Sequence, residues 1–170
     1  KQLTEVGVHV VYGFVELKTH AKLALIARRE SGRLVTYCHI GTGNYHPRTA
    51  RLYTDFSLLT SRPALTAEAA SLFNVLTGMS ETAHFDELLV APFNLAPRLL
   101  ELINRERANH RAGRPSGVFI KANGLVDQEI IDSLYAASRE GVSIDLLIRG
   151  ICCLSPGQPG ISESIRVRSI

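Results

Sequence analysis

Two histidines, a lysine and a glycine-rich turn lie within residues 20–44. One residue separates His20 from Lys22, and His39 precedes the run Gly41, Thr42, Gly43 and Asn44. A lysine supplies a compact positive charge, and glycines let backbone N–H groups approach an anion closely. An imidazole can carry a proton or attack phosphorus as a nucleophile. These residue types therefore predict a site that binds or transfers a phosphoryl group.

Two short apolar segments must position this cluster. Residues 23–27 form an apolar run bounded by charges, and residues 34–38 are rich in β-prone side chains. Glu-Ser-Gly at 30–32 is a turn signal between them. The pattern predicts two strands joined as an antiparallel hairpin.

The position of the turn decides which residues face each other. With a turn centred on Ser31, Leu23 lies opposite His39, and His20 lies opposite Thr42. We therefore expect both histidines, the lysine and the glycine turn to meet at the open end of one hairpin.

The wider sequence around these residues resembles a known family. Residues 18–22 (Lys-Thr-His-Ala-Lys), 37–45 (Tyr-Cys-His-Ile-Gly-Thr-Gly-Asn-Tyr) and 49–55 (Thr-Ala-Arg-Leu-Tyr-Thr-Asp) resemble bacterial polyphosphate kinase, a phospholipase D-like family. The resemblance covers nearly the whole chain and continues through Phe85-Asp86, residues 115–117, residues 134–138 and residues 147–150.

The resemblance implies an α/β fold with mixed sheets flanked by helices and two partial catalytic subdomains. Residues 1–83 would be the C-terminal part of the first subdomain, and residues 84–170 the N-terminal part of the second. The chain would then be a piece of a larger enzyme, one that is itself homo-oligomeric.

The resemblance also implies roles for individual residues. His20 matches the autophosphorylated histidine of the family, and His39 matches the second histidine of the same half. Tyr53 and Arg149 match positions that contact ATP. The implied reaction moves the γ-phosphate of ATP to His20 and then to the growing end of inorganic polyphosphate, reversibly. Mg²⁺ would assist, with its ligands outside this chain.

Chemistry and resemblance together assign the other site residues. Lys22 and Asn44 fit phosphate binding on both grounds, and the backbone of residues 41–43 can supply N–H donors. The role of His39 stays open between orienting the glycine turn and touching phosphate. Arg149 also follows a predicted buried strand, at the sheet edge where α/β proteins bind ligands.

The sequence departs from the phospholipase D pattern in two ways. Ala27 stands where the usual motif has an aspartate seven residues after the histidine, so Glu16 becomes a candidate for orienting His20. The second half has no further histidine–lysine set, and the family's partner histidine would lie beyond Ile170. We therefore expect the 170-residue chain alone not to make polyphosphate.

Two other functions fit the same residues. A phospholipase D-like phosphodiesterase would cleave diesters, although Ala27 weakens that reading. A non-enzymatic polyphosphate- or nucleotide-binding module would bind anions without acquiring phosphate on His20.

Composition sets broad limits. Of the 170 residues 45% are hydrophobic and 21% are charged, which is typical of a globular protein with a real core. The net charge of +3 suits an anionic substrate but does not demand nucleic acid, and none is expected as a partner. Three cysteines without metal-type spacing suggest reduced thiols. We expect a cytoplasmic protein, with peripheral attachment to the inner membrane left open.

Periodicity and end signals predict the remaining elements. Strands are expected at 8–12, 88–91, 118–122, 144–148 and 165–170. Helices are expected from an N-cap at Thr66 to about Leu76, from Pro97 along a face with Leu99, Leu100 and Ile103, and from Asp127 to Gly141. Residues 49–59 fit neither pattern clearly.

Overall fold

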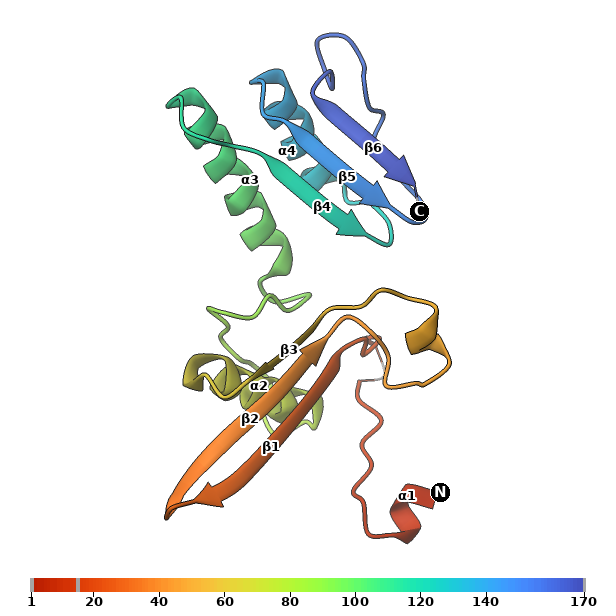
Figure 1. Ribbon diagram of the computed structural model, residues 1–170, viewed down its shortest axis with the longest axis vertical. Helices are drawn as coiled ribbons and strands as arrows, with labels where there is room; N and C mark the ends of the chain where they lie inside the picture. Colours follow the sequence, from red (N-terminus) through yellow and green to blue (C-terminus); the bar gives the residue numbers. More distant parts are fainter. Residues whose placement is uncertain (1, 15, 170) are drawn as a thin grey trace. The chain divides into compact units, whose positions relative to one another are not determined.

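The computed structural model describes residues 2–14 and 16–169 and divides the chain into two compact units, Lys1–Leu88 and Leu89–Ile170 (Figure 1). The division falls slightly after the boundary expected at residues 83 and 84. Both units combine helices with a three-stranded sheet, which confirms the mixed α/β fold class. Among the described residues, no helix is both long enough and apolar enough to cross a membrane.

The first unit is built on an antiparallel sheet with strand order β1-β2-β3. Helix α2 packs against β1 and β2 and lies behind them in Figure 1. Cys38 of β2 and Ala69 of α2 are among its buried residues. Its elements are α1 (Gln2–Glu5), β1 (Lys22–Glu30), β2 (Arg33–Gly41), the 3-10 turn η1 (Thr49–Arg51), β3 (Ser57–Thr60) and α2 (Pro63–Leu76).

The hairpin forms as predicted, but its register is one residue away from the expected one. Ser31 and Gly32 have φ values of 47° and 81°, the pattern of a two-residue type I′ turn. The turn therefore centres between these residues, and Ala24 rather than Leu23 lies opposite His39. A shift of one residue moves a side chain to the other face of the sheet. His20 precedes β1 and lies outside the paired ladder, so its predicted pairing with Thr42 is also wrong.

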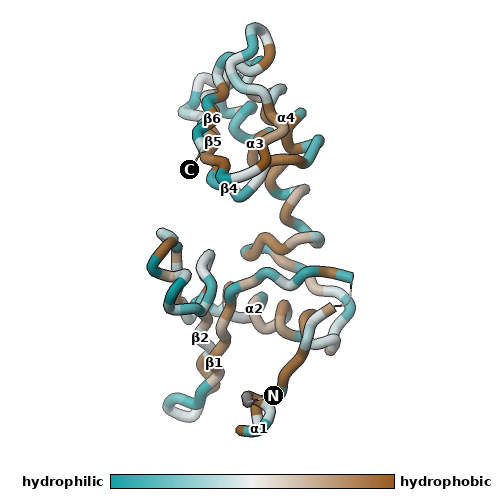
Figure 2. The backbone as a smooth tube through the Cα atoms, turned by 90° about the vertical axis from the view of Figure 1, so that its right-hand side faces the viewer, coloured by the Kyte–Doolittle hydropathy of each residue, from teal (hydrophilic) through white to brown (hydrophobic). Residues whose placement is uncertain are grey.

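The hydropathy of the hairpin changes along its length. The strands are hydrophobic near α2, and the tip that joins them is hydrophilic (Figure 2). At the tip, Glu30 accepts a hydrogen bond from the Tyr37 hydroxyl at 2.9 Å and pairs with Arg28 at 2.9 Å. A slip of one residue in β2 would turn the buried Cys38 to the other face of the sheet, so burial near α2 specifies the pairing.

The second unit is a parallel sheet with strand order β4-β5-β6 and a core shared with two helices. Its elements are α3 (Leu95–Arg111), β4 (Val118–Ala122), α4 (Gln128–Arg139), β5 (Ile144–Ile148) and β6 (Ile165–Ser169). Alternate residues of β5 are buried, and each contributes about 1.5–3 kcal/mol through removal from water. The core side chains include Ile103, Ile130, Ile131, Leu134, Ala137, Ile144, Leu146 and Ile148.

Most predictions for the second unit are confirmed. The Asp127 side chain caps α4 by accepting a hydrogen bond from the Ile130 N–H at 3.0 Å. Gly141 takes the positive φ of 95° that ends this helix. The parallel pairing of β4 with β5 follows the predicted strand–helix–strand order, and β6 forms over the described part of residues 165–170.

Two predicted strands do not form. Residues 8–12 have strand-like composition, but among the described residues no neighbouring strand pairs with them, and Tyr12 is 92% exposed. Residues 88–91 give their backbone donors to side chains instead. The Leu88 N–H donates to Glu68 at 2.8 Å, and the Val90 N–H donates to Asn94 at 2.7 Å. These two donors are therefore not available for a ladder.

Helix α2 begins three residues before the predicted cap. Pro63 occupies its first turn, where a fixed φ and a missing N–H cost nothing. Thr66 therefore lies inside the helix, and its hydroxyl donates to the Pro63 carbonyl at 3.3 Å. The end of the helix at Leu76 is as predicted.

Glu68 of α2 holds the last residues of the first unit through backbone hydrogen bonds. Its carboxylate accepts from the N–H groups of Asp86, Glu87 and Leu88 at 2.8–3.1 Å. Burial alone would raise the pKa of Glu68, but these bonds from Leu88, Glu87 and Asp86 outweigh it and leave the pKa below its ordinary value. The interaction is therefore stronger with the ionised carboxylate.

We expect Glu68→Gln to loosen this segment at neutral pH. Amide hydrogen exchange at Asp86, Glu87 and Leu88 should accelerate about fivefold, corresponding to about 1 kcal/mol for the lost charge. Because the folded pKa is lowered, the wild-type advantage is full at neutral pH and disappears as the pH falls through that pKa. Exposed Glu81→Gln is the control, and equal exchange in Glu68→Gln and wild type at pH 7 would contradict the assignment.

Candidate functional site

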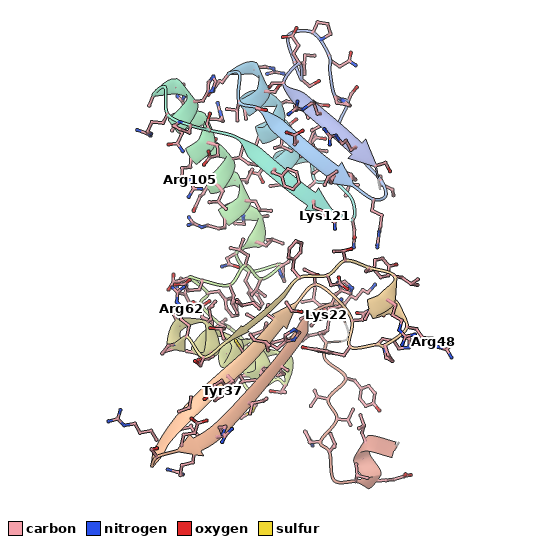
Figure 3. All side chains as sticks on the ribbon, in the orientation of Figure 1. Lys22, Tyr37, Arg48, Arg62, Arg105 and Lys121 are labelled. Carbon is pink, nitrogen blue, oxygen red and sulfur yellow. The ribbon has the colours of Figure 1, made fainter. Side chains whose placement is uncertain are left out.

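His20 and Lys22 lie at the end of the hairpin farthest from its turn. Figure 3 shows Lys22 at the start of β1, where it pairs with Gly41 of β2. The Lys22 Nζ lies 2.7 Å from His20 Nε2, and the pair is exposed. An ammonium group has donors only, so Nε2 accepts and the ring proton of neutral His20 lies on Nδ1. The lone pair of Nε2 therefore faces Lys22.

Glu16 was the candidate for orienting His20. The described hydrogen bond of His20 runs to Lys22 instead, and Glu16 is exposed. Lys22 therefore fixes which ring nitrogen of His20 keeps its lone pair. A carboxylate such as Glu16 was expected to have this role.

His39 projects from the same face of the hairpin as Lys22. Directly opposite residues share a face, so His39, its partner Ala24 and Lys22 all lie on the side away from the buried Cys38. His39 Nδ1 lies 2.5 Å from the Tyr45 hydroxyl. The edge of its ring lies against Gly41, where an added Cβ would be 2.9 Å from Cε1. Any residue other than glycine at 41 would displace the ring.

The glycine turn is fastened to the strand that follows it. The Thr42 hydroxyl donates to Asp55 Oδ1 at 2.9 Å and accepts from the Phe56 N–H at 2.9 Å, and the Thr42 N–H donates to the Phe56 carbonyl at 3.0 Å. Gly43 lies directly against the Asp55 carboxylate, because an added Cβ there would be 2.2 Å from Oδ2. Thr42 therefore holds the shape of the turn with both its amide and its hydroxyl.

Sequence reasoning did not single out Asp55 or Tyr45. Asp55 is separated from Thr42 by twelve residues whose secondary structure the sequence left open, and η1 and β3 bring the two together. Tyr45 follows Asn44 directly and lies in the loop after β2. The available signal was its position six residues after His39, across a turn that reverses the chain.

The remaining predicted residues of the first unit lie in the same loop. Asn44 is exposed, and its carbonyl accepts from the His46 N–H at 2.7 Å. Tyr53 lies between η1 and β3 and is about half exposed. The first unit thus brings His20, Lys22, His39 and residues 41–44 together on one face of the hairpin end, with Tyr53 later in the same connection.

Arg149 belongs to the second unit and directly follows the C-terminal end of β5. Its N–H donates to the Ala122 carbonyl at 3.2 Å, and the Gly150 N–H donates to the Asn123 carbonyl at 2.8 Å. An added Cβ at Gly150 would lie 2.9 Å from the Asn123 oxygen, so the backbone beside Arg149 is closely fitted. Arg149 therefore lies at the C-terminal end of β5, and its contact with ATP stays a prediction.

The described residues contain no group of three or more His, Cys, Asp or Glu side chains placed to hold a metal ion.

Comparison with known proteins identifies the class. Residues 1–82 match the family described as polyphosphate kinase C-terminal domain 1, and residues 88–170 match polyphosphate kinase C-terminal domain 2. Together the matches cover nearly the whole chain. The chain belongs to the polyphosphate kinase family.

Individual relatives agree with this placement. The chain is 53% identical over 170 residues to polyphosphate kinase of Streptomyces coelicolor and 53% identical over 169 residues to that of Pseudomonas aeruginosa. The crystal structure of polyphosphate kinase from Porphyromonas gingivalis matches with a TM-score of 0.85 and 40% identity over 99% of this chain and 28% of that one. The full chain aligns with only 23% of the length of the Streptomyces coelicolor protein, and 99% of the chain aligns with only 24% of the Pseudomonas aeruginosa protein.

Proposed function

We propose that this chain forms part of the catalytic region of a longer polyphosphate kinase, referred to below as the parent enzyme. The parent enzyme would transfer the γ-phosphate of ATP to the growing end of inorganic polyphosphate through phosphohistidine at His20. The observation that carries the proposal is the contact of Lys22 with His20 Nε2 at 2.7 Å, beside the glycine turn. It places a nucleophile whose lone pair lies on Nε2 beside a cation that attracts phosphate.

The transfer has two steps, and in each step one bond to phosphorus forms while another breaks. His20 Nε2 attacks the γ-phosphorus, the P–N bond forms, and the bond from the γ-phosphorus to the bridging oxygen breaks with its electron pair leaving on ADP. A terminal phosphate oxygen of polyphosphate then attacks the same phosphorus, and the P–N bond breaks with its electron pair returning to Nε2. Because each step exchanges one high-energy bond for another, the sequence runs in both directions.

Lys22 links substrate binding to activation of His20. In the free site its ammonium group covers the Nε2 lone pair. An incoming γ-phosphate carries more negative charge than a neutral imidazole and attracts the ammonium more strongly. Lys22 then moves to the phosphate oxygens and uncovers the nucleophile at the moment when phosphorus is in reach.

The other residues position and neutralise the phosphates. Gly43 and Asn44 offer backbone and amide donors at the turn, while Thr42 keeps its shape. By position in the family pattern, Tyr53 and Arg149 contact ATP. Mg²⁺ would partly neutralise the phosphate charge when bound, and we place its protein ligands outside this chain.

The setting follows from the same proposal. The substrates are ATP or ADP and inorganic polyphosphate, the parent enzyme is a homo-oligomer, and it works in the cytoplasm. Polyphosphate is a polyanion without bases, so the site needs cations and amide donors but no base-reading side chains.

Chemical mapping of the phosphoenzyme tests the proposal. The parent enzyme is incubated with γ-labelled ATP, and the label is tested for stability in acid and base. We expect acid-labile, base-stable label on the peptide that contains His20, which is released when polyphosphate or ADP is added. Diester cleavage without labelling would favour the phosphodiesterase alternative, and ATP binding with no covalent label would favour a binding module.

A further inference from the structure

Tyr45 and His39 form a close pair at the glycine turn. The Tyr45 hydroxyl lies 2.5 Å from His39 Nδ1, the ring centroids are 5.4 Å apart, and the rings are tilted by 52°. The two residues come from β2 and the loop that follows it, so the hydrogen bond crosses the turn that carries residues 41–44. Nothing in the proposed transfer so far uses this contact.

The contact sets the protonation of the His39 ring. A phenol hydroxyl is a good donor and a poor acceptor, because its oxygen lone pair is shared with the ring. Nδ1 of neutral His39 therefore accepts from Tyr45, and the ring proton lies on Nε2. This is the opposite tautomer from His20, whose Nε2 accepts from Lys22.

The geometry also sets where the Nε2–H group of His39 lies. Tyr45 contacts Nδ1, and the adjoining Cε1–Nε2 edge of the ring lies against Gly41, with an added Cβ there 2.9 Å from Cε1 and 3.4 Å from Nε2. Gly41 pairs with Lys22, which holds His20. The donor therefore lies on the face of the hairpin end that also carries the lysine and the nucleophile.

We propose that His39 is a neutral Nε2–H donor to the oxygens of the phosphoryl group in transfer, and that Tyr45 is the positioning residue that fixes this tautomer and ring orientation. The inference rests on the proposed function and assigns different work to the two histidines. His20 supplies a lone pair to phosphorus, and His39 supplies a proton in a hydrogen bond to oxygen.

Two substitutions of His39 separate its ring nitrogens. Glutamine places its NH₂ group near the position of Nε2, whereas asparagine places it near Nδ1. In the parent enzyme, we expect His39→Gln to keep the rate of His20 labelling within about tenfold of wild type and His39→Asn to lower it about a hundredfold or more. Equal losses in both variants, or better function in His39→Asn, would overturn the donor assignment.

Tyr45→Phe tests the positioning role. The ring is kept and the hydroxyl is lost, so we expect labelling to slow by about 10–100-fold with the Kd for ATP changed little. In the His39→Gln background the same change should cost almost nothing, because Tyr45 acts through the imidazole that is no longer there. A purely structural role for Tyr45 would give the same loss in both backgrounds and would overturn the proposal.

A control variant and the wild-type enzyme distinguish a failure of the Tyr45 role from a failure of the proposed function. Tyr12→Phe removes the hydroxyl of an exposed tyrosine outside the site and should label like wild type. If wild-type enzyme acquires no label on His20, the proposed function itself fails. If wild type labels normally and Tyr45→Phe labels at the same rate, only the role of Tyr45 fails.

Discussion

Replacing His20 by alanine in the parent enzyme is expected to lower phosphoenzyme formation and polyphosphate synthesis by at least roughly a thousandfold. The loss is large because no neighbouring group replaces the nucleophile. His39 lies nearby, but its Nδ1 is engaged by Tyr45 and its Nε2 carries the proton in the arrangement inferred above. Binding of ATP should persist, because Lys22 and the glycine turn remain and the ammonium is freed from His20.

The measurement is the amount of acid-labile label per enzyme, followed together with polyphosphate formation. His9→Ala is the matched control, since His9 is an exposed histidine in a segment outside the site. His39→Ala should label slowly but measurably, which separates the donor from the nucleophile. Full labelling of His20→Ala would remove His20 from the reaction path.

The second large effect is expected from Gly43→Ala, a change of one methyl group. The added Cβ would lie 2.2 Å from Asp55 Oδ2, well inside contact distance, so either the carboxylate or the turn must move. The Thr42 hydroxyl donates to Asp55 and accepts from the Phe56 N–H. Movement of the Asp55 carboxylate would therefore weaken the hydrogen bonds that join the turn to the residue before β3. We expect about a hundredfold loss of labelling, because displacements near 1 Å at a reacting centre have costs of that order.

The contact with Asp55 can be isolated by a double variant. Asp55→Ala removes the obstructing carboxylate and also the bond to Thr42, so it should itself be impaired. Adding Gly43→Ala to Asp55→Ala should cause little further loss, because the two changes act on one contact. Gly117→Ala is the control, since an added Cβ there meets only the Ser143 carbonyl at an ordinary 3.6 Å. Additive losses in the double variant would show that the turn does not depend on this contact.

The elements that could be predicted from sequence were those with local signals. Asp127 as a cap, Gly141 at a helix end and the apolar run of β5 each specify structure through neighbouring residues. The hairpin was predicted for the same reason. Its register was missed by one residue, because the choice between a turn centred on Ser31 and one centred after it depends on backbone angles that two positive φ values settle.

The errors came from residues whose hydrogen-bond partners are distant in sequence. Residues 88–91 look like a strand until Glu68 and Asn94 take their donors. The candidate site follows the same rule. His20, Lys22 and the glycines could be picked by type and spacing, whereas Asp55 needed the return of the chain through η1 and β3 to reach Thr42.

The two-residue connection of Ser31 and Gly32 lies at the opposite end of the hairpin from the candidate site, yet it decides which side chain the site receives. Adding one residue there would shift β2 by one position relative to β1 and present the thiol of Cys38 where the imidazole of His39 now stands. Removing one residue would shift β2 the other way and present the side chain of Ile40 at that position. Natural variation in the length of this connection should therefore occur in steps of two residues, and single-residue changes should be rare even though the tip is hydrophilic and exposed to solvent.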